Sequence, residues 1–400
     1  MATGRRMLAT VAVAALALSV AAPAPAKAPR EADQSDNVKL VATFPYDNEA
    51  GDFFKGGTDI DFSGRYVYAM QQGDMGGVHV IDHKGGTPKK VSFIPCPGGQ
   101  NDVAVVKPGL IAVGYHSSQC AGAPGGGVRL IDVSNPKKPK HLGAVNDIPG
   151  GTHTLTVYPG KPLIYSSPNG LGNVRGPEQI IDVSNPSKPK VVGTYQPAGN
   201  TCHDVSFHFT KDRKLAFCPG TSSTEVWDVS DPLAPDAIAR IVTPAIQYNH
   251  SAVATHDGKY LVIGDEAVAG NDCVGGPTGS LWIYDISTPE RPVLTGHFGP
   301  QRGPLPAGSS NVNRNTWCSA HLFNFVPGTY TLVASWYAGG MNVIDLSNPS
   351  QPKEVAHYMG TGDDITNYWS AYWYDGRIYA NDRVKGLDVF EVKGLKEGKH

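Results

Sequence analysis

The chain has 400 residues, a formal net charge of −2, 18% charged residues and 40% hydrophobic residues. This is the composition of an ordinary globular protein, and the near-neutral charge excludes the basic surface expected of a nucleic-acid-binding protein. The 47 glycines and 32 prolines predict many tight turns and few long helices.

The N-terminus has the three parts of a secretory signal peptide. Two arginines, Arg5 and Arg6, precede an apolar run from Met7 to about Ala22, and small residues follow near Ala26. We therefore predict a signal peptide over 1–26 and a disordered mature N-terminus over 27–37. A membrane anchor is the alternative, but the run is shorter than the roughly 20 residues that a span needs. We expect no transmembrane segment, and a secreted or cell-surface-associated monomer.

One sequence motif of about 16 residues then recurs along the chain. "LIDVSNPKKPKHLGAV" at 130–145 returns as "IIDVSNPSKPKVVGTY" at 180–195, and looser copies occur elsewhere. The aligned acidic residues are Asp82, Asp132, Asp182, Asp228, Asp285, Asp345 and Glu391. A period of this size is the mark of a repeat architecture.

Each repeat reads as four short strands. In the unit that begins at Thr201, apolar residues alternate or run for a few positions between turn residues. The Asp and Ser of the D-V-S-N-P stretch are suited to accept hydrogen bonds from turn N–H groups, and the prolines fix the entry to the fourth strand. Seven such units predict an all-β fold, a seven-bladed β-propeller of four-stranded antiparallel blades over 38–392.

The last unit lacks a fourth strand, because only the polar tail 393–400 follows Glu391 and Val392. The segment "VKLVATF" at 38–44 aligns with "PKVVGTY" at 189–195. We therefore expect this N-terminal strand to complete the seventh blade and close the ring.

The stretches "VRLIDVSNPKKPK", "EQIIDVSNPSKPK" and "MNVIDLSNPSQPK" resemble the LVIVD repeat of exported or cell-surface bacterial and archaeal β-propeller proteins. The resemblance covers about 38–392 and implies a propeller fold and a cell-surface location. It does not imply a defined biochemical activity.

Six cysteines in an exported chain predict disulfides. Cys202 and Cys218 bracket two strands that face each other across a hairpin, and Cys96 and Cys120 bracket a corresponding pair. Cys273 and Cys318 remain as the third pair. Free buried cysteines are the alternative.

Histidine recurs at one position of the repeat. The residue that begins the first, innermost strand is a histidine in the third to sixth units, namely His153, His203, His250 and His321. The other three units carry Thr58, Asn101 and Trp369 there, so the fold itself does not require histidine. Four imidazoles that meet at one end of a channel would suit one transition-metal ion, Fe, Cu or Zn. Glu266 and Asp204 are candidates to accept hydrogen bonds from the outer ring nitrogens.

A structural role is the alternative, since an imidazole bonded to neighbouring backbone would recur in the same way. The function we expect is a binding or interaction scaffold with a protein or small-molecule ligand at the channel mouth, and with a metal held by the four histidines. The competing hypothesis is an Fe- or Cu-dependent oxidase or oxygenase that acts on a small or apolar substrate. In that case the four histidines in a seven-bladed propeller would be similar in outline to the metal sites of two enzyme families, the carotenoid oxygenases and the selenium-binding-protein type methanethiol oxidases.

Overall fold

The computed structural model describes residues 31–46, 55–84, 87–116, 120, 125–168, 176–198, 201–267, 274, 276–304 and 316–398. The predicted signal peptide 1–26 lies outside these residues. Within them there is no α-helix, and no helix has the length and apolar character to cross a lipid bilayer.

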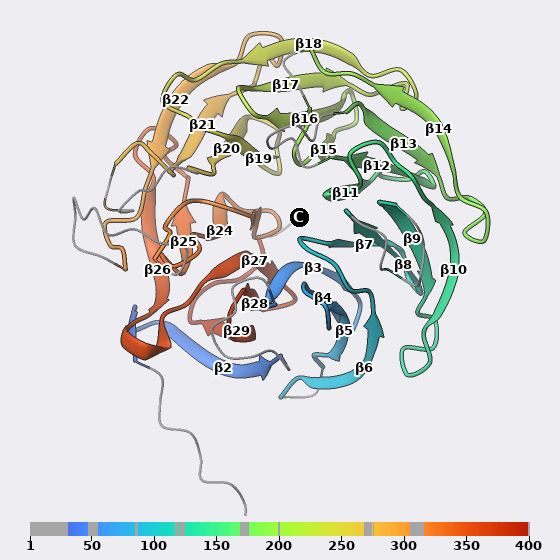
Figure 1. Ribbon diagram of the computed structural model, residues 1–400. Coiled ribbons are helices and arrows are strands. Elements are labelled where there is room, and N and C mark those ends of the chain that lie inside the picture. Colours follow the sequence, from blue (N-terminus) through green and yellow to red (C-terminus); the bar gives the residue numbers. More distant parts are fainter. Residues whose placement is uncertain are drawn as a thin grey trace, which may run out of the picture. The chain divides into compact units, whose positions relative to one another are not determined.

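Seven antiparallel sheets, here called blades 1 to 7, form a ring in the unit from Glu31 to His400 (Figure 1). Blades 1 to 3, from the innermost strand outwards, consist of β3 (Gly57–Ser63), β4 (Tyr66–Gln71), β5 (Gly77–Asp82) and β6 (Lys89–Pro95); β7 (Asp102–Lys107), β8 (Leu110–Tyr115), β9 (Gly127–Asp132) and β10 (Lys140–Val145); and β11 (Thr154–Val157), β12 (Leu163–Ser167), β13 (Glu178–Asp182) and β14 (Lys190–Tyr195).

Blades 4 and 5 consist of β15 (Ser206–Phe209), β16 (Lys214–Gly220), β17 (Ser223–Asp228) and β18 (Asp236–Ile241), and of β19 (Asn249–Ala254), β20 (Tyr260–Asp265), β21 (Leu281–Asp285) and β22 (Val293–Phe298). Blades 6 and 7 consist of β23 (Phe323–Phe325), β24 (Thr331–Ser335), β25 (Met341–Asp345), β26 (Lys353–Gly360) and β1 (Ala32–Gln34), and of β27 (Tyr368–Tyr374), β28 (Arg377–Asp382), β29 (Gly386–Val392) and β2 (Val38–Pro45). The predicted all-β, seven-bladed propeller is confirmed.

The ring closes through the N-terminal strand, as the sequence predicted. Strand β2 pairs with β29 from Val38 opposite Val392 to Pro45 opposite Gly386. The second strand of the described chain, β2, and its last strand, β29, therefore share one sheet, and blade 7 has its fourth strand.

The N-terminal residues before β2 differ from the prediction. Residues 27–37 were expected to be disordered, but Ala32–Gln34 form β1, a fifth strand that pairs with β26 of blade 6. Sequence patterning missed it because three residues are too few to show alternation.

The repeated acidic residue acts in the turn between the third and fourth strands. Asp182 Oδ1 accepts a hydrogen bond of 2.8 Å from the backbone N–H of Ser184, and Asp228, Asp285 and Asp345 bond the residue two positions on at the same distance. The register between third and fourth strands shifts in every blade, from Val80/Ile81 in blade 1 to Leu40/Ala42 in blade 7. Such bulges strengthen the twist of each blade.

The hydrophobic core lies between neighbouring blades. Val78 and Val80 of blade 1, for example, pack with Val103 and Ile111 of blade 2 in one buried cluster. Second strands are almost fully buried, whereas the outer strand β14 is mostly exposed. Each sheet is therefore buried against its neighbours, and the first strands are left to line the axis (Figure 1).

Two of the predicted disulfides are confirmed. Cys96 is bonded to Cys120 with Cα atoms 4.1 Å apart, and Cys202 is bonded to Cys218 with Cα atoms 5.1 Å apart. Cys318 is also disulfide-bonded. Its predicted partner, Cys273, lies outside the described residues.

Candidate metal centre

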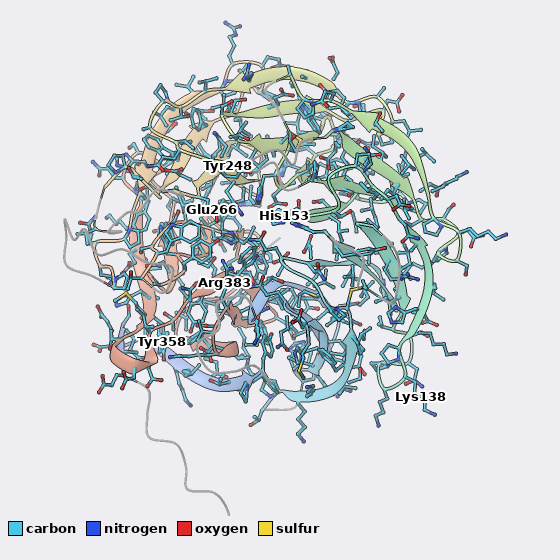
Figure 2. The ribbon with its side chains drawn as sticks, viewed as in Figure 1. Lys138, His153, Tyr248, Glu266, Tyr358 and Arg383 are labelled. Carbon is cyan, nitrogen blue, oxygen red and sulfur yellow. A yellow bond between two sulfur atoms is a disulfide. The ribbon has the colours of Figure 1, made fainter. Side chains whose placement is uncertain are left out.

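The four predicted histidines lie together around the axis. His153 directly precedes β11, His203 and His321 lie just before β15 and β23, and His250 is in β19. Neighbouring rings are in contact, with centroid distances of 4.4 Å from His153 to His203, 4.1 Å from His203 to His250 and 4.1 Å from His250 to His321. All four side chains are buried, and Figure 2 shows His153 beside the axis.

Hydrogen bonds from side-chain hydroxyls to backbone carbonyls of the next blade fix these positions. The Thr154 hydroxyl of blade 3 donates a hydrogen bond of 2.5 Å to the carbonyl of His203 in blade 4. The Ser251 hydroxyl of blade 5 donates one of 2.8 Å to the carbonyl of His321 in blade 6. Thr154, which follows His153, thus holds the backbone of His203 in the next blade, and Ser251, which follows His250, holds that of His321.

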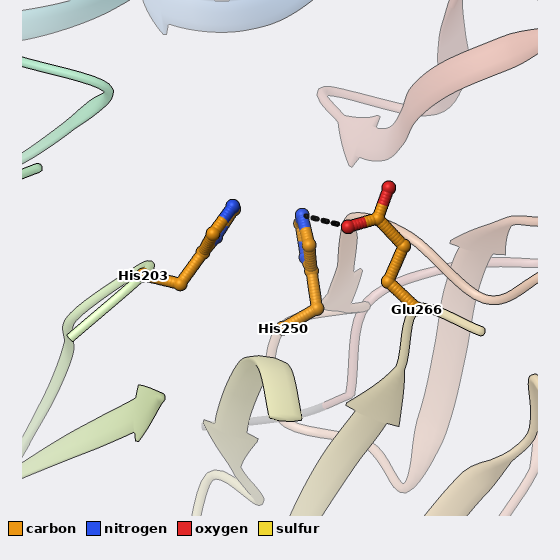
Figure 3. Close-up of side chains that lie close together, drawn as sticks. All are labelled: His203, His250 and Glu266. Atoms are coloured by element: carbon orange, nitrogen blue, oxygen red, sulfur yellow. Dashed lines mark ion pairs between the residues drawn. The ribbon is translucent and has the colours of Figure 1, made fainter. Parts of the chain in front are cut away.

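A tighter set of ligand atoms lies within this row. One ligand atom from each of His203, His250 and Glu266 lies within 4.8 Å of the other two, and no other such group of three was found in the described residues. Figure 3 shows the two rings and the carboxylate side by side, with Glu266 Oε2 3.7 Å from Nε2 of His250. All four predicted histidines line the same cavity at one end of the axis, and that they share one ion stays a prediction. The tightest set of ligand atoms also includes Glu266, with His153 and His321 on either side of it.

The ring nitrogens of His321 have different surroundings. Nδ1 lies 2.5 Å from the carbonyl oxygen of Trp369, which can only accept, so Nδ1 carries the hydrogen. Nε2 therefore holds a lone pair; it has no hydrogen-bond partner in the described residues and lies 3.8 Å from Glu266 Oε1. The structural alternative, an imidazole bonded to backbone, thus accounts for only one of its nitrogens.

His250 departs further from a structural role. Neither of its ring nitrogens has a hydrogen-bond partner among the described residues, and the side chain is 1% exposed. A buried polar atom without a partner destabilises a fold by about 1–3 kcal/mol. These orphaned nitrogens fit a site that coordinates an ion.

The electrostatics favour the ligand form of the rings. Burial holds the pKa of His203, His250 and His321 well below the usual value, and neighbouring imidazoles lower it further. The rings are therefore neutral at pH 7, the form that binds metals. Burial raises the pKa of Glu266 to about 7, against the opposing effects of a hydrogen bond from Tyr337 and the charge of Arg383.

Two further residues of the site escaped the sequence analysis. They appear when the residue after the second strand of each blade is aligned, which gives Gln72, His116, Pro168, Thr221, Glu266, Trp336 and Arg383. His116 Nε2 lies 2.8 Å from Nδ1 of His153, and the Arg383 guanidinium lies 4.5 Å from the ring centroid of Trp369. Figure 2 shows Glu266 and Arg383 near the axis with His153. Comparing this second position between repeats would have identified both residues.

Asp204 does not have the predicted role. In the described residues its carboxyl makes no hydrogen bond to a histidine ring, and its charged neighbour is Asp59. Burial and the Asp59 charge raise the pKa of Asp204 to about 8. Asp59 also accepts a hydrogen bond of 2.8 Å from the Tyr372 hydroxyl, and Asp102 lies beside it. Asp204 is therefore part of an acidic group and does not orient a ring.

One small cavity joins the histidines and this acidic group. Its accessible volume is about 20 Å³, close to the space that one water molecule occupies. The residues that line it include His153, His203, His250, His321, Asp59, Asp102, Asp204 and Trp369. The cavity has room for one ion or one molecule of the size of water.

Comparison with known proteins supports the fold. The family profile of the LVIVD repeat matches residues 179–197 and 325–360. These stretches cover the third and fourth strands of blade 3 and most of blade 6. The chain carries LVIVD repeats.

No curated protein matches the sequence. A similar solved structure is the crystal structure of the β-propeller domain of Cps50 (Swd1) from Myceliophteria thermophila, with a TM-score of 0.60 and 11% sequence identity over 89% of this chain and 100% of that chain. At this identity the likeness concerns the propeller fold alone.

Proposed function

We propose that the protein is a propeller-type binding scaffold whose functional site is the histidine end of the axis, and that this site binds a first-row transition-metal ion. The observation that carries the proposal is the set His203, His250 and Glu266, whose ligand atoms lie within 4.8 Å of one another. The unpartnered nitrogens of His250 and His321 support it. The LVIVD repeats are compatible with a scaffold and do not bear on the metal.

The donor set selects among metals. Two imidazoles and one carboxylate suit Zn, Fe or Cu, and are poor ligands for the alkaline-earth ions that prefer oxygen alone. His153 and His321 flank the set and would serve as further ligands. When bound, the ion would supply Lewis acidity at the cavity.

An Fe- or Cu-dependent oxidase is the second candidate. Two histidines and one carboxylate leave coordination positions open, and this favours redox chemistry on a small molecule. The cavity of about 20 Å³ does not accommodate an extended apolar substrate in the described structure. Oxygen consumption by the metal-loaded protein with small oxidisable substrates tests this candidate.

We also propose that the protein works outside the cytoplasm, secreted or associated with the cell surface. The N-terminal pattern over 1–26 and the disulfides support export. The test is the N-terminal mass of protein recovered from the native host, which would begin near residue 27 if the signal peptide is removed.

Metal analysis tests the site. Protein purified from the periplasm, with and without incubation in Fe(II), Cu(II) or Zn(II), would be compared with His250→Ala and Glu266→Gln. The matched control is His141→Ala, which removes an exposed histidine from β10. About one ion per chain, lost in both site variants and kept in the control, would support the proposal. If the wild type holds none of the three ions, the proposed metal site is wrong and only the proposed binding scaffold remains.

A further inference from the structure

The short strand β1 covers the outer edge of blade 6. It pairs with β26 through three residue pairs, from Ala32 opposite Gly360 to Gln34 opposite Tyr358. The other six described sheets have four strands and no such cover. Three backbone pairs contribute little stability by themselves. Backbone bonds flank them on both sides, and side-chain contacts add to these.

His357 of β26 is the centre of these side-chain contacts. Its Nε2 lies 3.0 Å from Asp33 Oδ1 on β1. Its Nδ1 lies 2.8 Å from the Ser35 hydroxyl and 3.0 Å from Glu354 Oε1. The backbone N–H of Ser35 also donates to the carbonyl of His357, at 3.1 Å.

Arg302, from the segment after β22 of blade 5, completes the cluster. Its Nη2 lies 2.7 Å from Glu354 Oε1, and its Nε lies 3.6 Å from Asp33 Oδ2. The residue of β25 that faces His357 is the uncharged Asn342. Two carboxylates thus share one arginine, and their charges are balanced only when His357 carries a proton.

We propose that β1 is a proton-dependent latch on blade 6, closed when protonated His357 bridges Asp33 and Glu354 and released when His357 loses its proton. Asp33 is the only one of these charged groups that lies on β1. Deprotonation of His357 removes the ionic part of the contact between β1 and β26, and leaves Asp33 with only the longer ion pair to Arg302, at 3.6 Å. Release of β1 leaves the pairing of β2 with β29 intact, and the ring remains closed. What changes is the edge of β26, whose N–H and C=O groups become available for pairing.

The sign of the pH dependence follows from the surroundings of His357. Burial acts to lower its pKa, but hydrogen bonds to Glu354 and Asp33 outweigh burial and raise the pKa above its usual value. A raised pKa in the docked state means that the latch is fully stabilised below the ordinary histidine pKa of about 6.5. This stabilisation is lost as the pH rises through the docked value.

Hydrogen–deuterium exchange of the full-length protein tests the latch. Protection of residues 31–37 and 353–361, corrected for intrinsic exchange, would be measured from about pH 6 to about pH 9. We expect protection to fall with rising pH, by about tenfold for each pH unit by which docking raises the pKa of His357. Protection of β2 and β29 should not change.

Two variants separate the latch from general loosening. His357→Gln keeps a hydrogen-bonding side chain without a titrating proton, and Asp33→Asn removes the partner on β1. Both should show weak protection of β1 that no longer depends on pH. His141→Gln, on the exposed outer strand of blade 2, should behave as the wild type. Equal protection of wild-type β1 across the pH range, or a pH dependence that survives in His357→Gln, would overturn the proposal.

Discussion

Nε2 of His116 lies 2.8 Å from Nδ1 of His153, and this contact joins the residue after the second strand of blade 2 to the residue before the first strand of blade 3. The centroids of the two rings are 4.9 Å apart. Five imidazoles therefore follow one another around the axis from blade 2 to blade 6. The outer contact restrains the orientation of His153, as a partner of a metal-binding histidine does.

Replacement of His116 tests this relationship. His116→Phe keeps a ring of similar size but removes the contact with His153, so we expect metal affinity to fall by about 10- to 100-fold, the usual effect of losing such a partner. Calorimetric titration with Zn(II) measures it. His141→Phe, in the same blade, is the control. Unchanged affinity in His116→Phe would show that the contact between His116 and His153 takes no part in binding.

The pH dependence of metal binding should reflect Glu266. Its carboxyl must be ionised to bind an ion, and its pKa is raised to about 7. The Tyr337 hydroxyl donates a hydrogen bond of 2.7 Å to Glu266 Oε1 and so favours the ionised form. We expect affinity to rise between about pH 6 and pH 8, and Tyr337→Phe to move this rise to higher pH.

Metal titrations at several pH values measure this shift. The matched control is Tyr165→Phe, because Tyr165 donates its hydroxyl hydrogen bond to the carbonyl of Pro232 and neither residue lines the cavity. An identical pH profile for Tyr337→Phe and wild type would contradict the assigned role of Tyr337.

Buried carboxyls should make the protein less stable at high pH. Burial raises the pKa of Glu178 to about 8, although the Ser167 hydroxyl bonds its Oε1 at 2.8 Å. A carboxyl whose pKa is raised on folding stabilises the protein fully below its unfolded pKa, and this stabilisation is lost as the pH rises through the folded value.

We therefore expect the free energy of unfolding to fall between about pH 5 and pH 9, by on the order of 2 kcal/mol more in the wild type than in Glu178→Gln. Denaturant unfolding at a series of pH values measures the difference. Glu397→Gln, at an exposed position, is the control. A steeper decline in Glu178→Gln than in wild type would contradict the prediction.

The disulfide next to His203 should support both stability and the site. Cys202 and Cys218 are 16 residues apart in sequence, and a loop of this size gives about 3 kcal/mol of stabilisation. The N–H of His203 bonds the carbonyl of Pro219, at 2.7 Å, so the bridge also holds this histidine. The double variant Cys202→Ala/Cys218→Ala should unfold more easily and bind Zn(II) more weakly.

Cys96→Ala/Cys120→Ala provides the comparison, since it removes a bridge that is not adjacent to a histidine. We expect a similar loss of stability, measured by denaturant unfolding, with a smaller loss of affinity. Equal affinity losses in the two double variants would mean that the bridge has no particular effect on His203.

The sequence determined the fold to the level of individual strands. Recurrence of Asp182 and its equivalents marked each turn between the third and fourth strands, because the side chain bonds a backbone N–H only two residues away. Alternating apolar residues set the strands, and the match between 38–44 and 189–195 revealed the closure by β2. The strand β1 has only three residues, so it showed neither the alternation of apolar residues nor a match to another repeat.

The sequence also placed His153, His203, His250 and His321 at equivalent positions, because a repeat preserves the relation between a residue and its own strand. It did not determine which ligand atoms meet. Glu266 lies beside His203 and His250, and His116 lies beside His153. These pairs are separated by different numbers of residues in the chain, so no repeated spacing indicates the contacts. Those contacts depend on how the blades are arranged around the axis, so only the tertiary structure decided them.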